Sequence, residues 1–428
     1  MRLFNRIAFA SLSAGLVVTG ALVPVESAAA SSTSPGVTGN TITIGVTYVD
    51  LASVAQFIHG LNQGNYQAVY QALINNINAH GGIDGRMIRA DYEPIDPIGT
   101  TSSSAACTQL TEDDNVFAVM GFFQDNDPAC YVTLHDTPEI GGTMTTQLLS
   151  AAKAPWFSAT PIENQLEPET VAAAAAHGIF KGKKVAVFSQ SDAPPGLVSS
   201  VIAALKKHGV TPVATAQVDA ETNDTEASIQ QIADVVTQKF QSAGANVVVA
   251  VGNAGDSWPN ATNTGTYHPL LVAGYEPALT TFTGTASANA PAIANAVSGD
   301  TEPLSVGTKT VGWADPAMQQ CVHVVEAAGQ KVPSPVDNSS GPNQQFFSVV
   351  QACQNLALFT AIAKRAGKTL DNQTFARAGD TLGTVHIPAL GSGAFSKSAP
   401  AGMFPLYLYT WSAAQDQLVP SSTPIGTT

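Results

Sequence analysis

Five acidic side chains lie in loops that directly follow predicted β-strands. They are Asp125, Asp127, Asp192, Asp256 and Glu276. Two neighbouring carboxylates such as Asp125 and Asp127 can act as a general acid and a general base, and a single carboxylate can bind the cationic group of a solute. Loop acids are also common as solvated surface groups. All three roles stay open until the elements that position these acids are considered.

The motifs of the main enzyme classes are absent from the sequence. It contains no G-x-S-x-G nucleophile turn, no G-x-G-x-x-G loop and no Walker phosphate loop. It also contains no C-x-x-C and no H-E-x-x-H, and its eight histidines are scattered, although His323 follows Cys321 by two residues. We therefore expect no enzymatic activity, no catalytic residue, no metal and no cofactor.

The composition excludes several other classes of protein. The chain has 428 residues, a formal net charge of -14, 44% apolar residues, 36 Gly and 26 Pro. It is too apolar for a disordered polymer and too rich in Gly and Pro for a coiled coil. The acidic balance supplies no basic stripe for a phosphate backbone, so nucleic acid is excluded as a partner. A chain of this length predicts two lobes or domains.

The N-terminal segment has the pattern of a secretory signal. Arg2 and Arg6 precede an apolar run broken by Gly and Pro, and small residues up to Ala30 form a peptidase site. A membrane anchor is the alternative interpretation. We predict a signal peptide over residues 1–30 and a flexible leader over residues 31–40. The mature chain is then exported to the periplasm or the exterior, and no lipid anchor is evident because no Cys lies near the cleavage site.

Export makes disulfides the expected state of the four cysteines. An even number of cysteines in an oxidising compartment favours pairing, and four of them allow three connectivities. Proximity in the sequence favours the pairs Cys107–Cys130 and Cys321–Cys353.

Strand and helix patterns alternate along the chain in two series. Residues 41–49, "TITIGVTYV", predict a buried strand, and residues 66–80 place apolar side chains at helical spacing. A second series begins near Lys181 and runs to about Thr310. Two long helices over residues 315–328 and 344–366 and a β-like tail follow. This alternation predicts an α/β fold with parallel sheets and crossover helices.

Several of these stretches resemble a known family. "ITIGVTY", "INNINAHGGIDGRMIRADYE", "QLTEDDNVFAVMG", "KKVAVFSQSD" and "PLLVAGYEPAL" occur in the order found in type I periplasmic binding proteins. The chain most resembles the leucine/isoleucine/valine-binding proteins that deliver amino acids to ABC transporters. The resemblance covers nearly all of the mature chain, and "INAHGGIDGR" is its most specific part.

The resemblance implies two Rossmann-like lobes joined by three hinge crossings, with a solute bound between them by hinge closure. One lobe would comprise residues 41–162 plus 314–386, and the other residues 163–313 plus 387–428. The implied partners are a small-molecule solute and an ABC transporter permease, with the binding protein acting as a monomer. A secreted sensor of the same fold is one alternative, and an enzyme that uses the loop acids is another.

Ligands of parallel α/β sheets bind beyond the carboxyl ends of the strands. The candidate ligand-binding residues in the corresponding loops are Phe57, Gln124, Asp125, Thr160, Asp192, Asn253, Trp258, Tyr275 and Glu276. The resemblance places Glu276 against a ligand ammonium group and Thr160 against a ligand carboxylate. Their alternatives are a solvated loop acid and a turn residue.

The chain departs from the amino-acid binders at several of these loops. "FFQDNDPAC" replaces a Ser-rich loop, and its acids Asp125 and Asp127 would repel a carboxylate unless they point outward or bind a cation. "SQSDAPPG" lacks the usual aromatic residue. Phe57 and Trp258 are candidate stacking walls, with core packing as the alternative. We therefore expect a cationic, amide or polyhydroxy solute rather than a plain branched-chain amino acid.

Overall fold

The computed structural model describes most of the chain after the predicted signal peptide, which itself lies outside the described residues. The described residues are 34–53, 62–124, 126–191, 193–219, 226–252, 254–262, 265–274, 291–301, 312–335, 344–412, 414, 417–420 and 426–427.

The first sheet is parallel throughout. Its strands are β1 (Thr41–Val49), β2 (Met87–Ile95), β3 (Ala118–Gly121), β4 (Glu139–Ile140) and β5 (Trp156–Phe157), in the order β2-β1-β3-β4-β5. β-branched residues dominate β1, and its side chains at Ile42, Ile44 and Val46 are fully buried.

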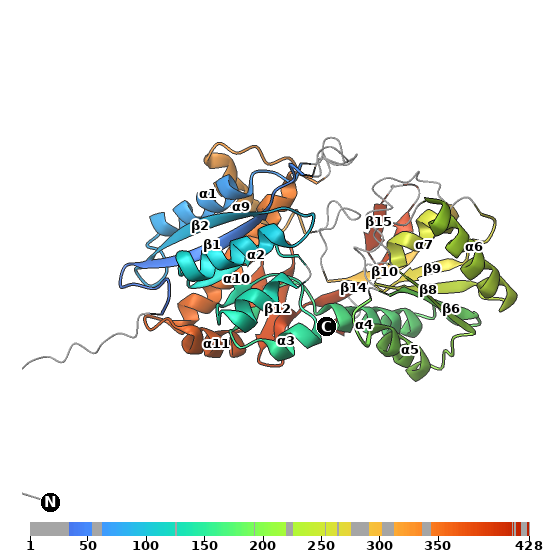
Figure 1. Cartoon of the computed structure of the whole chain (residues 1–428). Helices are drawn as coiled ribbons and strands as arrows, with labels where there is room; N and C mark the ends of the chain where they lie inside the picture. The colour runs from blue at the N-terminus through green and yellow to red at the C-terminus, as the bar shows by residue number, and fades with distance from the viewer. Residues whose placement is uncertain are drawn as a thin grey trace, which may run out of the picture. The chain divides into compact units, whose positions relative to one another are not determined.

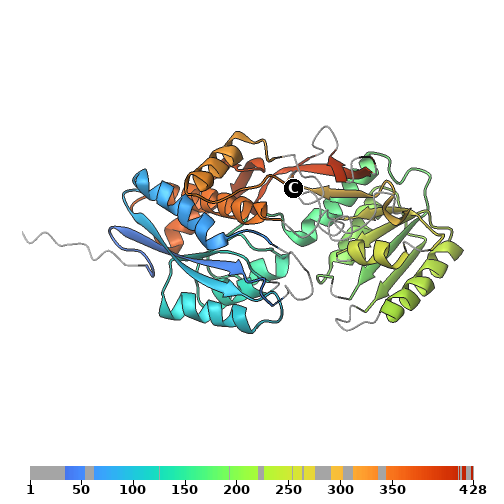
Figure 2. The same cartoon turned by 90° about the horizontal axis from the view of Figure 1, so that it is seen from above.

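Helices cover both faces of this sheet. They are α1 (Tyr66–Ala79), α2 (Thr101–Thr108), η1 (Gln109–Asp113), η2 (Ala129–Leu134), α3 (Thr146–Ala151), α9 (Pro316–Ala327), α10 (Phe346–Ala366) and α11 (Asn372–Asp380). One core contains apolar residues of β1, α1, α9, α10 and α11, and a second contains residues of α2, η1, η2 and β5. Figure 2 shows these two layers, blue and orange on one side of β1 and cyan on the other.

The described part of the predicted leader is packed rather than flexible. The N–H of Thr43 donates to the carbonyl of Gly36 at 2.7 Å, and Val37 forms an antiparallel bridge with Ile42. Gly36 has a φ of +68°, and a Cβ there would lie 2.2 Å from the backbone nitrogen of Phe117. Glycine therefore lets residues 34–40 fold back onto β1, which corrects our expectation for this part of the leader.

The second sheet repeats the parallel pattern and extends it. Its parallel strands are β6 (Val185–Gln190), β7 (Ala214–Val218), β8 (Val247–Val251), β9 (Leu270–Ala273) and β10 (Val297–Asp300). Antiparallel β14 (Pro405–Ser412) pairs with β10 and with two short strands, β15 (Gln417–Pro420) and β16 (Gly426–Thr427). The sheet order is β15-β14-β10-β9-β8-β6-β7.

Among the described residues, two helices cover each face of the second sheet. They are α4 (Glu163–Ala176), α5 (Leu197–Lys207), α6 (Glu226–Ser242) and α7 (Ala254–Thr262), and a short helix η3 (Pro291–Ile293) precedes β10. Val185 and Val187 of β6 pack with α4 and α5, whereas Ala186 and Phe188 pack with α6 and α7. Figure 1 shows the sheet between these pairs of helices. The α/β class with two parallel sheets is therefore confirmed.

A small antiparallel sheet moves one expected lobe boundary. It consists of β11 (Gly383–Ile387), β12 (Gly391–Ser396) and β13 (Ala399–Met403). Ile387, Leu390, Phe395 and Phe404 pack in the core of the first sheet, although we expected residues from 387 onward in the other lobe. Because β14 pairs with β10, we propose that this crossing lies near Phe404, between β13 and β14.

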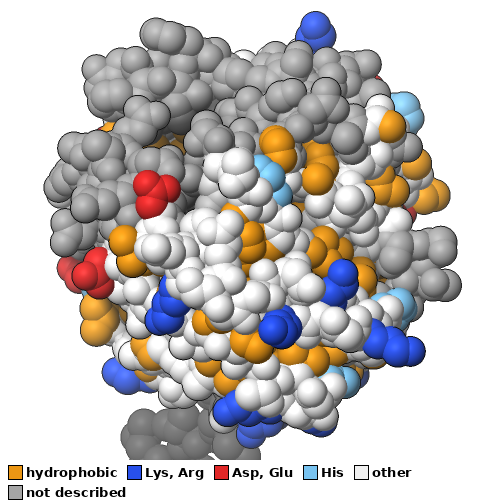
Figure 3. Space-filling view, turned by 90° about the vertical axis from the view of Figure 1, so that its right-hand side faces the viewer, with side chains coloured by type: hydrophobic (Ala, Val, Ile, Leu, Met, Phe, Trp, Pro, Cys, Tyr) orange, Lys and Arg blue, Asp and Glu red, His pale blue; other side chains and the backbone are white. Residues whose placement is uncertain are grey.

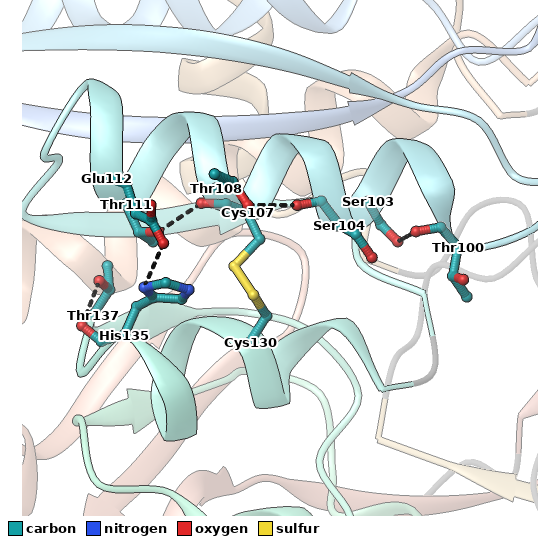
Figure 4. The surroundings of a disulfide bond; sticks show 10 residues. All are labelled: Thr100, Ser103, Ser104, Cys107, Thr108, Thr111, Glu112, Cys130, His135 and Thr137. Carbon is teal, nitrogen blue, oxygen red and sulfur yellow. Dashed lines mark hydrogen bonds and ion pairs between the residues drawn. A yellow bond between two sulfur atoms is a disulfide. The ribbon is translucent and has the colours of Figure 1, made fainter.

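Both expected disulfides are present. Cys107 of α2 is bonded to Cys130 of η2, and Cys321 of α9 is bonded to Cys353 of α10. Figure 4 shows Cys107 and Cys130 joining two helical segments on the same side of the sheet. Each disulfide therefore ties together two helices that cover the first sheet.

One described helix, α10, is long and apolar enough to cross a membrane by length and composition. Of its apolar window, 67% is buried inside the protein, and residues such as Phe359 and Ile362 are fully buried. Its apolar character is thus explained by its position in the core of the first lobe.

Candidate functional site

The parallel strands of the two sheets follow the same order. The first runs β2-β1-β3-β4-β5, and the parallel part of the second runs β7-β6-β8-β9-β10. The direction of winding therefore reverses between β1 and β3, and again between β6 and β8. In such sheets ligands bind beyond the carboxyl ends of the strands at this reversal. The loops after these four strands are the candidate site, and they include most of the predicted residues.

At the first reversal the loop after β3 is held tightly to β1. The buried hydroxyl of Thr47 donates to the carbonyl of Phe122 at 2.6 Å, and the N–H of Phe122 donates back to the carbonyl of Thr47 at 3.0 Å. Gly121 has a φ of +126°, and a Cβ there would lie 1.9 Å from the carbonyl oxygen of Thr47. Only glycine permits this close approach. The start of the predicted ligand loop is therefore rigidly placed.

The predicted residue Gln124 lies in this loop and braces it. Its side-chain amide donates to the carbonyl of Asp96 at 2.9 Å, and its backbone N–H donates to a carboxylate oxygen of Asp127 at 2.8 Å. Asp127 is half-buried, and its own N–H donates to the carbonyl of Gln124. At least part of the Asp127 charge is therefore directed at its own loop.

A buried carboxyl group lies next to this loop. Glu139 of β4 is 0% exposed, and neither of its oxygens has a hydrogen-bond partner among the described residues. A Cβ added at Gly142 would lie 2.6 Å from Glu139 Oε1 and 3.3 Å from the ring of Phe123, which places the carboxyl against the ligand loop. Burial raises the pKa of Glu139 well above its ordinary value, and the charge of Asp127 raises it further.

Tyr131 belongs to the same buried group. Its hydroxyl is also without a hydrogen-bond partner in the described residues, and its ring packs edge-on against Phe123 with centroids 5.6 Å apart. Burial raises the pKa of Tyr131, and the charges of Glu139, Asp127 and Glu93 add to this shift. Tyr131 therefore adds a neutral hydroxyl, without a hydrogen-bond partner in the described residues, to the buried group around Glu139.

The predicted residue Thr160 follows β5. Its backbone N–H donates to the hydroxyl of Ser158 at 3.1 Å, and that hydroxyl donates to the carbonyl of Gly142 at 3.0 Å. Ser158 is fully buried and its N–H donates to the carbonyl of Pro400. Because the N–H of Thr160 is already engaged, a contact with a solute carboxylate would depend mainly on its hydroxyl.

At the second reversal a residue that we did not predict holds the loop after β8. Both carboxylate oxygens of Glu167, on α4, accept the N–H of Gly252, at 3.0 and 3.1 Å. Glu167 is fully buried, and a Cβ at Gly274 would lie 2.5 Å from Glu167 Oε2. The carboxylate therefore fixes the start of the loop that carries Asn253. The sequence signal is an acid in the buried stripe of a helix, beside Leu166 and Val171.

We expect Glu167→Gln to lower the free energy of unfolding by about 1 kcal/mol, because a charge-assisted hydrogen bond becomes a neutral one of similar geometry. Urea denaturation at pH 7 measures this loss. Glu169→Gln, two residues along the same helix and only partly buried, is the control and should change stability less. Equal effects of the two substitutions would show that the bond to Gly252 contributes nothing specific.

More buried polar groups occur in α4 and in or just after β10. The hydroxyls of Thr170, Ser298 and Thr301 are buried without a hydrogen-bond partner in the described residues. Gly299 allows close packing here, since a Cβ at this position would lie 2.2 Å from Thr170 Oγ1. α4 therefore packs closely on β10 through Thr170 and Gly299, beside the apolar cluster that Val297 of β10 forms with residues of α4.

The predicted residue Trp258 lies in the core. It is 1% exposed, and its ring centroid lies 5.3 Å from that of Phe188 and 5.7 Å from that of Phe240. Its placement matches the alternative of core packing on α7. The remaining predicted ligand residues, namely Phe57, Asp125, Asp192, Asn253, Tyr275 and Glu276, lie outside the described residues. The backbone of Asp256 is part of α7, but its side chain is outside the description.

The structure also contains a pocket of about 230 Å³. It is lined by Pro161, by Gln165 and Glu169 of α4, and by residues of the small sheet such as Ala401 and Met403. Burial raises the pKa of Glu169. None of the predicted residues lines this pocket, and it is smaller than the roughly 300–1,000 Å³ usual for ligand sites.

One group of described side chains has the spacing of metal ligands. It consists of Cys107, Cys130 and His135. Because the two sulfur atoms are joined in a disulfide, they offer no thiolate to a metal. His135 instead lies 3.8 Å from the carboxylate of Glu112. Figure 4 marks this interaction with a dashed line.

A model of the periplasmic binding protein family matches residues 41–416, which include all parallel strands of both sheets and both reversals. The chain belongs to the periplasmic binding protein family. The resemblance seen in the sequence is therefore confirmed. Members of this family bind solutes rather than transform them, and the family implies a location outside the cytoplasm. No curated protein matches this periplasmic binding protein in sequence.

Solved structures of solute-binding proteins share its fold. An ABC transporter substrate-binding protein from Desulfitobacterium hafniense, in complex with Leu, is 14% identical with a TM-score of 0.61, and the match covers 89% of this chain and 100% of that one. An R. palustris solute-binding protein in complex with 4-hydroxybenzoate is 15% identical with a TM-score of 0.63, covering 91% and 97%.

A leucine-binding protein from Thermotoga maritima is similar as well. It is 13% identical with a TM-score of 0.59, and the match covers 90% of this periplasmic binding protein and 99% of that chain. At such identities the three structures bear on the fold and leave the solute open.

Proposed function

We propose that the chain captures one small polar solute at the carboxyl ends of its two parallel sheets and delivers it to an ABC transporter. The observation that carries this proposal is the repeated strand order, which gives each sheet a reversal point of the kind where ligands bind. At each reversal, buried hydrogen bonds fix a loop start, through Thr47 in one sheet and Glu167 in the other.

The proposed site lies between two lobes that close on the solute. The first lobe carries the loops with Gln124 and Thr160. The second carries the loops with Asp192, Asn253 and Glu276, for which we propose contacts with the polar groups of the solute. Rigid loop starts support this mechanism, because a binding site that assembles by hinge closure requires each half to be ordered beforehand.

The solute class that we propose is an amino acid, an amide or a related compound. The solved relatives hold leucine and 4-hydroxybenzoate, which share a carboxylate and an apolar part. In this chain, Asp125, Asp127 and Glu276 add negative charge to the loops in question. A solute that also carries a cationic or amide group would suit these acids better than an aromatic acid with a single carboxylate.

A thermal-shift screen tests the proposal. The panel contains leucine, amides, polyamines, sugars and 4-hydroxybenzoate, each added to the purified mature chain. A solute present at a hundred times its dissociation constant should stabilise the fold by about 2.7 kcal/mol, because it binds only the folded state. We expect a clear rise in melting temperature for one chemical class. If no member of the panel shifts it while one is hydrolysed, the binding role is wrong.

A further inference from the structure

Half of the chain's twelve lysines occur between residues 181 and 239, although the chain as a whole is acidic. All six are exposed. They are Lys181, Lys183, Lys184, Lys206, Lys207 and Lys239. We call this group the basic edge.

The topology of the second sheet brings these lysines together. Lys181, Lys183 and Lys184 precede β6, while Lys206 with Lys207 ends α5 and Lys239 lies in the last turn of α6. In a parallel sheet with crossover helices, the starts of the strands and the ends of the helices lie at the same edge. Figure 3, which faces this side of the molecule, shows many basic side chains and few acidic ones.

Lys184, just before β6, lies close to the turn that follows α6. A Cβ added at Gly244, in the turn after α6, would lie 3.2 Å from Lys184 Nζ. The backbone N–H of Lys184 also donates to the side chain of Asn246 at 2.9 Å. The lysine that opens β6 therefore lies against the end of α6, close to the turn that carries Lys239.

The helix ends explain the presence of only three of the six lysines in the basic edge. Lys206, Lys207 and Lys239 complement the negative ends of their helix dipoles. Lys181, Lys183 and Lys184 end no helix. Within the described ranges, no carboxylate oxygen lies within 4.0 Å of any of the six ammonium groups. The positive charge of the edge is therefore available to an external anion.

Two exposed apolar side chains accompany the lysines. Val213, just before β7, is 43% exposed, and Val235 of α6 is 64% exposed. Val235 lies four residues before Lys239 and so shares its face of the helix. A cluster of lysines with isolated apolar side chains matches the surface of a bilayer, where anionic phosphates lie above an apolar interior.

We propose that the basic edge docks this protein on anionic phospholipid headgroups. The proposal is independent of the solute and concerns the opposite end of the strands. The candidate solute loops follow the carboxyl ends of β6 and β8, whereas the basic edge lies at their amino ends. Docking would thus hold the protein at the membrane surface while the solute loops of this lobe stay accessible.

Co-sedimentation with vesicles tests this docking. The mature chain is mixed at low salt with vesicles of phosphatidylglycerol and phosphatidylcholine, or of phosphatidylcholine alone. We expect binding to the anionic vesicles only. The protein should be released at 0.5 M salt, because the electrostatic screening length there is roughly one order of magnitude shorter than at low millimolar salt. Inorganic phosphate at the same ionic strength as NaCl should release no more protein than NaCl does. This result would distinguish binding to an anionic lipid surface from binding to free phosphate.

A matched pair of variants locates the contact. Lys181→Gln/Lys183→Gln/Lys184→Gln should weaken binding about a hundredfold, given roughly fivefold per lysine near an anionic surface. Lys331→Gln/Lys364→Gln/Lys368→Gln removes the same charge from exposed positions elsewhere and should change affinity less than about threefold. Equal loss in both variants, binding to phosphatidylcholine alone, or no binding by the wild type would overturn the proposal. In that last case, an acidic protein surface would be the alternative partner of the basic edge.

Discussion

Replacing Cys321 and Cys353 together by serine is expected to lower the free energy of unfolding by about 3–4 kcal/mol. The bond closes a loop with a sequence separation of 32 and joins α9 to α10 in the main core of the first lobe. Closing a loop of this length removes entropy from the unfolded chain, and the chain-entropy relation gives this magnitude. Equilibrium denaturation in urea under oxidising conditions measures the loss.

The second disulfide supplies the control for this experiment. Cys107→Ser/Cys130→Ser opens a loop with a separation of 23 and should lower stability by about 3–4 kcal/mol, a few tenths less than the first pair. A reductant should destabilise the wild type, and it should have no effect on a variant that lacks both pairs. An unchanged unfolding midpoint in Cys321→Ser/Cys353→Ser would contradict the structural role of that bond.

Replacing Glu139 by methionine is expected to raise the free energy of unfolding at pH 7 by roughly 1–3 kcal/mol, because it removes a buried carboxyl group that has no hydrogen-bond partner among the described residues. Methionine has a similar length and is readily accommodated in a core. Most substitutions of buried residues destabilise proteins, so a gain here would be diagnostic.

The same residue sets a pH dependence of stability. Burial and Asp127 raise the pKa of Glu139 in the folded state, so the unfolded chain releases this proton at lower pH than the folded chain does. The folded state then binds more protons, and the contribution of Glu139 to stability falls as the pH rises from its ordinary pKa near 4.5 toward the raised value.

Unlike Glu139→Met, Glu139→Gln removes the titrating proton of Glu139 without removing the polarity of its side chain. Its amide keeps the size and polarity of the side chain but carries no proton to lose, so this part of the pH dependence should vanish. Glu326→Gln, on the exposed face of α9, is the control and should leave it in place. A Glu139→Gln variant whose stability falls with pH as steeply as that of the wild type would show that another group is responsible.

Much of the fold follows from patterns in the sequence, and the exceptions have physical causes. The β-branched runs of β1, β6 and β8 predict their strands directly. β4 escapes prediction because it has only two residues, one of them Glu139. β10 reads "VSGD", and its low strand propensity is overridden by pairing with β9 and β14. The small sheet β11–β13 is rich in Gly and Ala and is shaped by packing around Phe395 and Phe404.

The sequence predicts a location for the candidate site more readily than it predicts the buried residues that hold its loops. The βα order alone places it in the loops after β1, β3, β6 and β8. Exposed-looking acids such as Asp127 attract attention in a sequence, whereas Glu167 and Glu139 are recognised only once their burial is known. Long-range hydrogen bonds such as that from Gly252 to Glu167 join residues 85 positions apart, and no local pattern reports them.

The most direct test of the proposed function is a calorimetric titration of the mature chain with the solute that raises its melting temperature, followed by mass analysis of the bound compound. We predict saturable binding of one solute per chain and recovery of the solute unchanged, with weaker binding in Glu276→Gln if the solute carries an ammonium group. Absence of saturable binding for every class in the panel, or recovery of a chemically altered compound, would contradict a solute-capturing role.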